Sequence, residues 1–281
     1  MTTFYSDIRC GLPLVLASLL LIGCGGTGED PGPEGGTCEP VPESQLEDCE
    51  VDAPRRVETQ SGLQQICESA CRNIDELMLV QVPGLKNLNA LSNKVVKDIT
   101  LEDLPELQST AALQLESGGS LIVRFAPNLE SLDAMQGVTE LSRLSIEGVG
   151  LEDFQDVGSL EELVPDSSGL GGYLTVMESE LNDYSPFEGL DVTNDELTFQ
   201  SNDGLTELPQ LSGEVSQIFL RFNDNLTDIS ALRSLDGISQ GITIRGNSSL
   251  SSCHIQDVLE DVQMGSSASV VVEENSSQPC N

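Results

Sequence analysis

The side chains that could carry covalent chemistry in this 281-residue chain are eight cysteines and one histidine, His254. His254 directly follows Cys253, and no His-Glu-x-x-His motif, Gly-x-Ser-x-Gly motif or Cys-His pair with an orienting third group is present. We therefore expect no catalytic residue, no metal site, no cofactor and a structural role for His254. A glycan-cleaving enzyme with paired carboxylates on a β-helix is the rival hypothesis, but 47 acidic residues make any one pair uninformative.

The N-terminal segment predicts export. Residues 12–22 form an apolar run that is too short to cross a bilayer but is typical of a secretion signal. The run ends in Leu21-Ile22-Gly23-Cys24, which resembles the lipobox of bacterial lipoproteins. This resemblance implies a signal peptide over residues 1–23 and a lipid on Cys24. An ordinary signal peptide with an incidental Cys is the alternative.

The segment after the lipobox predicts a tether. Residues 24–37 are rich in Gly and Pro and have no apolar face, which is typical of a disordered linker. Gly25 follows Cys24 where an Asp would signal retention, so analogy with Gram-negative lipoproteins implies the outer membrane. Whether the protein faces the periplasm or the outside is left open.

The formal net charge is −35, and losing Asp7 and Arg9 with the signal peptide would not change it. Such a surface repels nucleic acid and anionic lipid headgroups, so nucleic acid is excluded as a partner. High charge also favours solubility. The triplet Asn223-Asp224-Asn225 superficially suggests cation binding, but its spacing matches no full EF-hand loop.

Six cysteines are left if Cys10 is removed and Cys24 is lipidated, which predicts disulfides in an exported chain. Zinc is the competing interpretation, but it requires closely paired ligands. We expect Cys253 to pair with Cys280. Among the four N-terminal cysteines three pairings are possible, and we expect bonds from the second pair back to the first pair: Cys67 and Cys71 to Cys38 and Cys49.

A repeat fills the rest of the chain. Leucines that follow a turn recur at intervals of 22, 22, 22, 30, 24, 21 and 24 residues, at Leu85, Leu107, Leu129, Leu151, Leu181, Leu205, Leu226 and Leu250. A period in the low twenties predicts a solenoid in which each coil adds one strand to a parallel sheet. The 30-residue interval contains the loop 165–172. The sequence thus predicts a mostly β fold, a right-handed parallel β-solenoid of about eight to nine coils of 21–24 residues.

Each coil is expected to bury two alternate apolar strand residues. The predicted pairs are Leu77 and Leu79, Ile99 and Leu101, Leu121 and Val123, Leu144 and Ile146, Leu174 and Val176, Leu197 and Phe199, Ile218 and Leu220, Ile242 and Ile244, and Val270 and Val272. Three residues after the second apolar position, the later coils predict a ladder of buried amides at Asn202, Asn223, Asn247 and Asn275. The earlier coils have Val82, Leu104 and Ala126 at this position, so a different turn is possible in them.

The repeat needs covers at both ends, so we expect an N-terminal cap over residues 38–75, a solenoid over 76–252 and a C-terminal cap over 253–281. A helix is predicted in each cap from its apolar face. These faces are Leu63, Ile66, Cys67, Ala70 and Ile74 at the front, and Ile255, Val258, Leu259 and Val262 at the back.

The pattern Ile242-x-Ile244-x-x-Asn247-x-x-Leu250-x-x-Cys253, with a following helix and Cys280, resembles the receptor L-domain family, which is related to leucine-rich repeats. More narrowly, it is similar to L-domain-type lipoproteins of Gram-negative bacteria, over roughly residues 60–281. Leucine-rich repeats place one residue between Asn and the next Leu, whereas this chain has two. The resemblance implies a parallel β-helix used for recognition and no catalytic residue.

The outward positions of the strands are the expected ligand-binding face. Its predicted members are Arg124, Phe219, Arg221, Thr243 and Arg245. Guanidinium groups beside an aromatic ring suit a ligand with carboxylate or sugar groups. Neutralisation of these arginines by nearby acidic side chains such as Glu147 or Glu273 is the alternative. The predicted function is a membrane-anchored, non-catalytic recognition or adhesion module of the cell envelope that binds a glycan or protein; a structural envelope lipoprotein without a specific ligand is the other candidate.

Overall fold

The computed structural model describes residues 38–51, 55–151, 153–166, 169 and 171–276. The predicted signal peptide, Cys24, the linker and Cys280 lie outside these residues. Within the described part of the chain, no helix is both long enough and apolar enough to cross a membrane.

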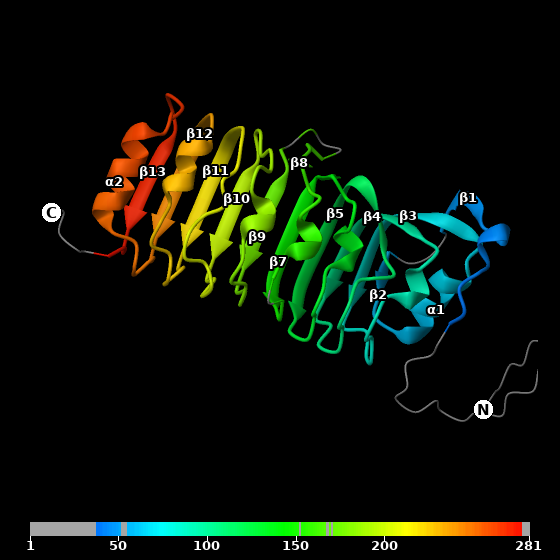
Figure 1. Ribbon diagram of the computed structural model, residues 1–281. Coiled ribbons are helices and arrows are strands. Elements are labelled where there is room, and N and C mark those ends of the chain that lie inside the picture. Colours follow the sequence, from blue (N-terminus) through cyan, green and yellow to red (C-terminus); the bar gives the residue numbers. More distant parts are fainter. Residues whose placement is uncertain (1–37, 52–54, 152, 167–168, 170, 277–281) are drawn as a thin grey trace, which may run out of the picture. The chain divides into compact units, whose positions relative to one another are not determined.

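The described residues form a mostly β fold built on one parallel sheet (Figure 1). Ten strands follow one another in the order β1-β3-β4-β5-β7-β9-β10-β11-β12-β13, and β2 pairs with β3. A second, two-stranded sheet joins β6 to β8. The strands are β1 (Glu47–Glu50), β2 (Arg56–Val57), β3 (Cys71–Val80), β4 (Val95–Glu102), β5 (Gln114–Ala126), β6 (Glu140–Leu141), β7 (Arg143–Val149), β8 (Glu162–Leu163), β9 (Tyr173–Met177), β10 (Glu196–Gln200), β11 (Glu214–Arg221), β12 (Gly237–Arg245) and β13 (Ser269–Glu273).

The strand register aligns the predicted apolar pairs in two continuous rows. Leu77 pairs with Ile99, Ile99 with Leu121, and the row continues strand by strand to Val270. Every member from β3 to β12 is buried, because each strand lies between two others. Val270 and Val272 differ: they are 50% and 41% exposed, since β13 is the last strand of the sheet and only β12 pairs with it.

The connections between strands cover one face of this sheet (Figure 1). They contain short 3-10 helices at Asn89–Leu91, Asp133–Met135, Gln155–Val157, Ser185–Phe187 and Ser230–Ser234. Each helix turns an apolar side chain into the same core as the strand rows, for example Met135 and Phe187. The ring of Phe154 packs edge-on against Tyr184 and Phe187. Because the core lies on this side only, the opposite sheet face carries no covering layer among the described elements.

The N-terminal cap contains a shorter helix than the sequence predicts. Helix α1 spans Gln60–Glu68, where the side chain of Thr59 accepts the Gly62 N–H and caps the first turn. Beyond Glu68 the prediction was wrong, because the chain turns extended and Cys71 opens β3. The residue expected to close the helical face, Ile74, is buried as a strand residue instead. Pairing with β1 and β4 satisfies the backbone of this segment.

Two disulfides join the N-terminal cap. Cys38 pairs with Cys67 of α1, and Cys49 of β1 pairs with Cys71 of β3. Both bonds therefore run from the second pair of cysteines back to the first pair. Cys253 is also disulfide-bonded. Its predicted partner Cys280 lies outside the described residues, so that pairing stays a prediction.

A buried cation that the periodicity did not indicate ties the N-terminal cap to the sheet. The Lys94 side chain is fully buried, and its Nζ donates to the carbonyl oxygens of Ser69, at 2.5 Å, and Cys71, at 2.9 Å. These carbonyls lie just beyond the C-terminus of α1, where a positive charge is favourable. Burial lowers the pKa of Lys94 because it penalises the charged ammonium.

Candidate recognition surface on the sheet

The uncovered side of the sheet, hereafter the free face, presents three rows of side chains in register. The first row runs through Asp98, Ser120, Arg143 and Tyr173, and the second through Thr100, Ile122, Phe219 and Thr243. The third contains Glu102, Arg124, Glu147, Met177, Gln200, Arg221, Arg245 and Glu273. Side chains on neighbouring strands stand about 5 Å apart at the backbone, so the rows can act together on one ligand.

A buried asparagine ladder holds the turn at the end of the later strands. The Oδ1 atom of Asn223 accepts the backbone N–H of Asn202 at 3.0 Å, and its Nδ2 donates to the carbonyl of Phe199 at 3.0 Å. Asn247 makes the equivalent bonds to Asn223 and Leu220. Asn202 bonds in the same way to Ser179 and Val176, and Asn275 to Asn247 and Ile244. We call each strand of the large sheet, together with the turn that follows it, a rung. Each amide thus pairs backbone groups of the preceding rung that no strand partner reaches.

The earlier rungs turn in the same way without asparagine. Two residues after the second apolar residue of each predicted pair, the backbone is left-handed. These residues are Gln81, Asp103, Phe125, Gly148, Glu178, Ser201, Phe222, Gly246 and Glu274. The turns before Val82, Leu104 and Ala126 therefore do not differ in backbone, and these apolar side chains are buried where the amides lie in later rungs. The shared turn keeps all strands in one register and so keeps the free face regular.

Four of the five predicted face residues meet on β11 and β12. Phe219 pairs with Thr243 and Arg221 pairs with Arg245 across the two strands. We call Phe219, Arg221, Thr243 and Arg245 the β11–β12 patch. The Arg221 guanidinium stacks on the Phe219 ring at 4.3 Å from the ring centre. Arg245 instead turns to Glu274, with Nε–Oε2 at 3.0 Å and a second bond at 3.2 Å.

The two neighbouring arginines of the patch therefore have different partners: Arg221 contacts an aromatic ring and Arg245 a carboxylate. The hydrogen bonds to Glu274, and then its charge, raise the pKa of Arg245. Neutralisation by acidic neighbours therefore describes Arg245, which also lies 3.8 Å from Glu273. It does not describe Arg221, for which no carboxylate of the described residues lies within ion-pair distance.

Arg124, the fifth predicted residue, lies apart from the patch. It belongs to β5, and β7, β9 and β10 separate it from β11. Its Nε lies 3.3 Å from Oε2 of Glu147 on the neighbouring strand. Glu147 is thus the ion-pair partner of Arg124, as the neutralisation hypothesis expects.

A second feature of the free face, which we call the β4–β9 groove, was missed by sequence reasoning. It is a hollow of about 270 Å³ whose lining includes Asp98, Thr100, Ser120, Arg143 and Tyr173. The Arg143 guanidinium stacks on the Tyr173 ring at 4.5 Å. Only the loop 165–172 within the irregular 30-residue interval could have pointed here, because insertions into a repeat often border its binding face.

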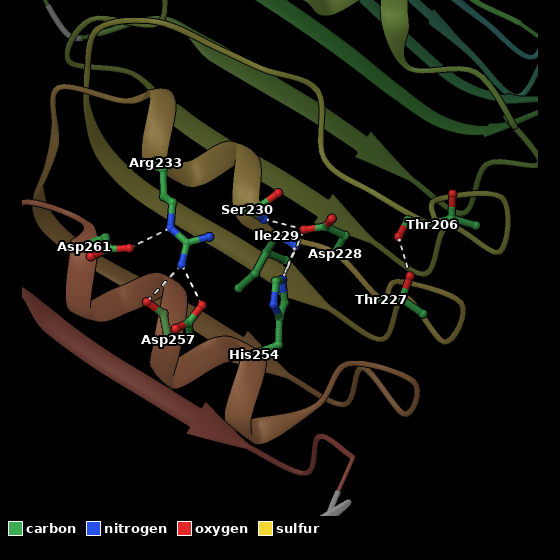
Figure 2. A network of polar contacts seen from close by, with 9 residues as sticks. All are labelled: Thr206, Thr227, Asp228, Ile229, Ser230, Arg233, His254, Asp257 and Asp261. Atoms are coloured by element: carbon green, nitrogen blue, oxygen red, sulfur yellow. Dashed lines mark hydrogen bonds and ion pairs between the residues drawn. The ribbon is translucent and has the colours of Figure 1, made fainter. Parts of the chain in front are cut away.

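A polar network ties the C-terminal helix α2 (Ser252–Asp261) to the rung before it (Figure 2). Arg233 donates to Asp257 at 2.7 Å and to Asp261 at 2.8 Å. His254 accepts the Ile229 N–H at Nε2, 3.1 Å away, and the same nitrogen lies 3.1 Å from Asp228 Oδ1. The backbone N–H of Ser230 donates to Asp228 at 2.7 Å and holds the pKa of Asp228 below its ordinary value.

These contacts give His254 a structural position in the C-terminal cap. Among the described residues no group of three or more His, Cys, Asp or Glu side chains is arranged to hold a metal ion. Compared with known proteins, the chain matches no family model, no curated protein and no solved structure.

Proposed function

We propose that this protein is a non-catalytic recognition module of the bacterial cell envelope that binds a glycan or protein ligand through the free face of its sheet. The observation that carries the proposal is Arg221. It is stacked on Phe219 and has no carboxylate partner among the described residues, in a chain of net charge −35. A guanidinium without a carboxylate partner can donate charge-assisted hydrogen bonds to the acceptor oxygens of a ligand.

The sheet supports this proposal at the level of architecture. Its inward rows are buried, so the outward rows are rigidly spaced and need no rearrangement to meet a partner. We further propose that the repeat is a right-handed parallel β-solenoid of the receptor L-domain type. Parallel bridges between successive connections, such as Ser109 with Ser131 and Glu207 with Asp228, favour stacking of whole coils.

The proposed location is the outer membrane, with the protein held by lipid on Cys24. The support is the lipobox-like sequence Leu21-Ile22-Gly23-Cys24 and the Gly/Pro-rich stretch after it. Metabolic labelling with a radioactive or alkyne fatty acid tests the anchor. Native protein should carry the label and Cys24→Ala should not; label on the Cys24→Ala protein would contradict lipidation at this residue.

The binding proposal is tested with the full chain, purified in detergent and applied to an array of glycans and envelope proteins. Charge reversal by Arg221→Glu together with Arg245→Glu should weaken capture of whatever the native protein binds by at least tenfold, because a desolvated charge-assisted hydrogen bond contributes about 1.5–3 kcal/mol. The control is Lys86→Glu, at an exposed residue away from the sheet, which changes the net charge by the same amount as Arg221→Glu alone.

The alternatives predict other outcomes. A structural envelope lipoprotein would give no capture above background for native or variant protein. If the patch is not the binding site, native, control and double-reversed proteins would bind equally. A glycan-cleaving enzyme would shorten the captured oligosaccharides, which chromatography of the eluted glycans would reveal.

A further inference from the structure

The β4–β9 groove forms where the sheet departs from its repeat. In β5, residues 116–119 lie opposite the single Lys97 of β4, so the strand bulges before it resumes its register at Ser120. Gly118 from this bulge and Asp166 from the long connection before β9 line the groove. Two local insertions therefore meet at one hollow of an otherwise regular face, as in repeat proteins that build binding sites from inserted loops.

The polar groups of the groove divide into paired and unpaired sets. Glu76 is bound by Arg55 at 2.8 Å, and Lys97 lies 3.8 Å from Asp75. By contrast, the Asp98 carboxylate has no ion-pair or hydrogen-bond partner within the described part of the chain. The same holds for the hydroxyl groups of Thr100, Ser120 and Tyr173. Among the same described residues, the Arg143 guanidinium has only its stacking contact with the Tyr173 ring.

These unpaired groups specify complementary chemistry in the ligand. A carboxylate and three hydroxyl groups side by side match a ligand rich in hydroxyl groups, which both donate and accept. The planar guanidinium matches a carboxylate, which it can bind through two parallel hydrogen bonds. Asp98 on β4 and Arg143 on β7 are two strand spacings apart, about 10 Å, which is a distance that consecutive sugar units can bridge.

A peptide fits this groove less well. The backbone N–H and C=O groups of β4, β5 and β7 already pair with one another, so a peptide lying on the face cannot add itself as a further strand. The groove also offers one apolar side chain, Ile122, and no deep apolar pocket for an anchoring residue.

We propose that the β4–β9 groove binds an acidic oligosaccharide, with a uronic acid carboxylate on Arg143 and neighbouring sugar hydroxyl groups on Asp98, Thr100 and Ser120. This inference rests on the proposed recognition function and names the ligand class of one part of the same face. The groove is distinct from the β11–β12 patch, in which the Arg221 guanidinium stacks on the Phe219 ring.

The test measures binding of the full chain in detergent to galacturonic acid oligomers and to galactose oligomers of equal length, by isothermal titration calorimetry. Native protein should bind the acidic series at least tenfold more tightly. Arg143→Gln should abolish that preference, because the neutral amide cannot pair with the carboxylate. Lys86→Gln is the control: it removes one positive charge at an exposed residue outside the groove and away from the sheet, and should leave both affinities unchanged.

A second variant tests the groove without altering charge. Ser120→Phe fills the space between Asp98 and Arg143 on the free face and should weaken both oligomer series together. The inference is overturned if native protein shows no acidic preference, if Lys86→Gln lowers affinity as much as Arg143→Gln, or if acidic peptides bind with the same dependence on Arg143 while the oligosaccharides do not. Capture of another ligand by the array described above, with no uronate binding, would overturn this inference and leave the recognition function standing.

Discussion

A buried amide stabilises a fold only when its polar atoms are all bonded, and the asparagine ladder meets that condition. Asn223 is fully buried and uses its side chain to pair one N–H and one C=O of the rung before it. An apolar side chain at this position would fill the space but leave both backbone groups unpaired. In the earlier rungs the apolar residues Val82, Leu104 and Ala126 fill it, so the ladder belongs to the C-terminal half of the sheet.

We therefore expect Asn223→Ala to lower the free energy of unfolding by about 3 kcal/mol, because it strands two buried backbone groups and leaves a small cavity. Urea denaturation followed by circular dichroism measures the loss. Asn225→Ala is the control, since this exposed amide makes one bond, to the Asp203 carbonyl at 2.8 Å. Equal losses in the two variants would show that the ladder contributes nothing beyond a surface hydrogen bond.

Asp195 is a residue whose burial makes stability depend on pH. Its side chain is fully buried, one oxygen accepts the Gly172 N–H at 2.5 Å, and the other has no partner among the described residues. Burial raises the pKa of Asp195 to about 7, with smaller contributions from the negative charges of Asp191 and Glu162. Between about pH 4 and pH 7, Asp195 is therefore protonated in the folded state, whereas in the unfolded chain, where the carboxyl pKa is about 3.9, it is ionised.

From this shift we expect Asp195 to reduce the stability of the fold as pH rises from about 4 to about 7, and to add a constant penalty above that range. Asp195→Asn stays neutral and keeps an oxygen for Gly172, so the melting temperature of the variant minus that of the native protein should increase over this interval. Differential scanning calorimetry at several pH values measures it. Asp224→Asn controls for the loss of one exposed charge; a difference curve that is flat for Asp195→Asn would refute the assignment.

At the scale of elements, the turn that closes every rung determines how the strands stack. Two of its left-handed positions hold exposed phenylalanines, and each ring covers a glycine of the next rung: Phe125 covers Gly148, and Phe222 covers Gly246. A Cβ added at Gly246 would approach Cδ1 of Phe222 to 2.4 Å. Glycine is required there both for its positive φ of 71° and for the close approach of the ring.

Gly246→Ala should therefore destabilise the fold by more than the cost of about 1–2 kcal/mol for a left-handed alanine. The matched control is Gly84→Ala, because Gly84 has φ of 69° and nothing within 4 Å of its added Cβ. Thermal denaturation of both variants, and of Gly246→Ala combined with Phe222→Ala, gives the comparison. The excess cost should disappear when Phe222 is absent; identical costs at Gly84 and Gly246 would mean that the ring yields freely.

The caps show how far element prediction reaches. The N-terminal helix was predicted from the spacing of Leu63, Ile66 and Cys67, all of which are buried in α1. The same spacing extends to Ile74, but β3 takes this residue, because pairing with the neighbouring strands satisfies its backbone equally well. Helical periodicity cannot detect a competing partner that is distant in sequence.

At the scale of the whole molecule, a steeply acidic chain presents a face on which the few cations are placed by the strand register. Glu147 and Glu274 neutralise Arg124 and Arg245, whereas Arg143 and Arg221 lie on aromatic rings. Exposed charges are screened over about 10 Å at ordinary ionic strength. The repulsion of an approaching anion by distant acidic residues is therefore weaker than its attraction to a guanidinium that it contacts. The recognition that we propose for this face is thus a local property of two small regions.

The amino-acid sequence is enough to predict the rows of the sheet. Alternating apolar residues at a period in the low twenties place Leu77 through Ile244 in two buried rows, since a strand with one apolar side can stack in only one register without exposing it. The tertiary structure decides which arginines of the free face have a carboxylate partner among the described residues, because a salt bridge such as that of Arg245 with Glu274 depends on side-chain directions across neighbouring strands. It also decided the position of the groove, since two insertions distant in sequence meet there and no periodic signal records their meeting.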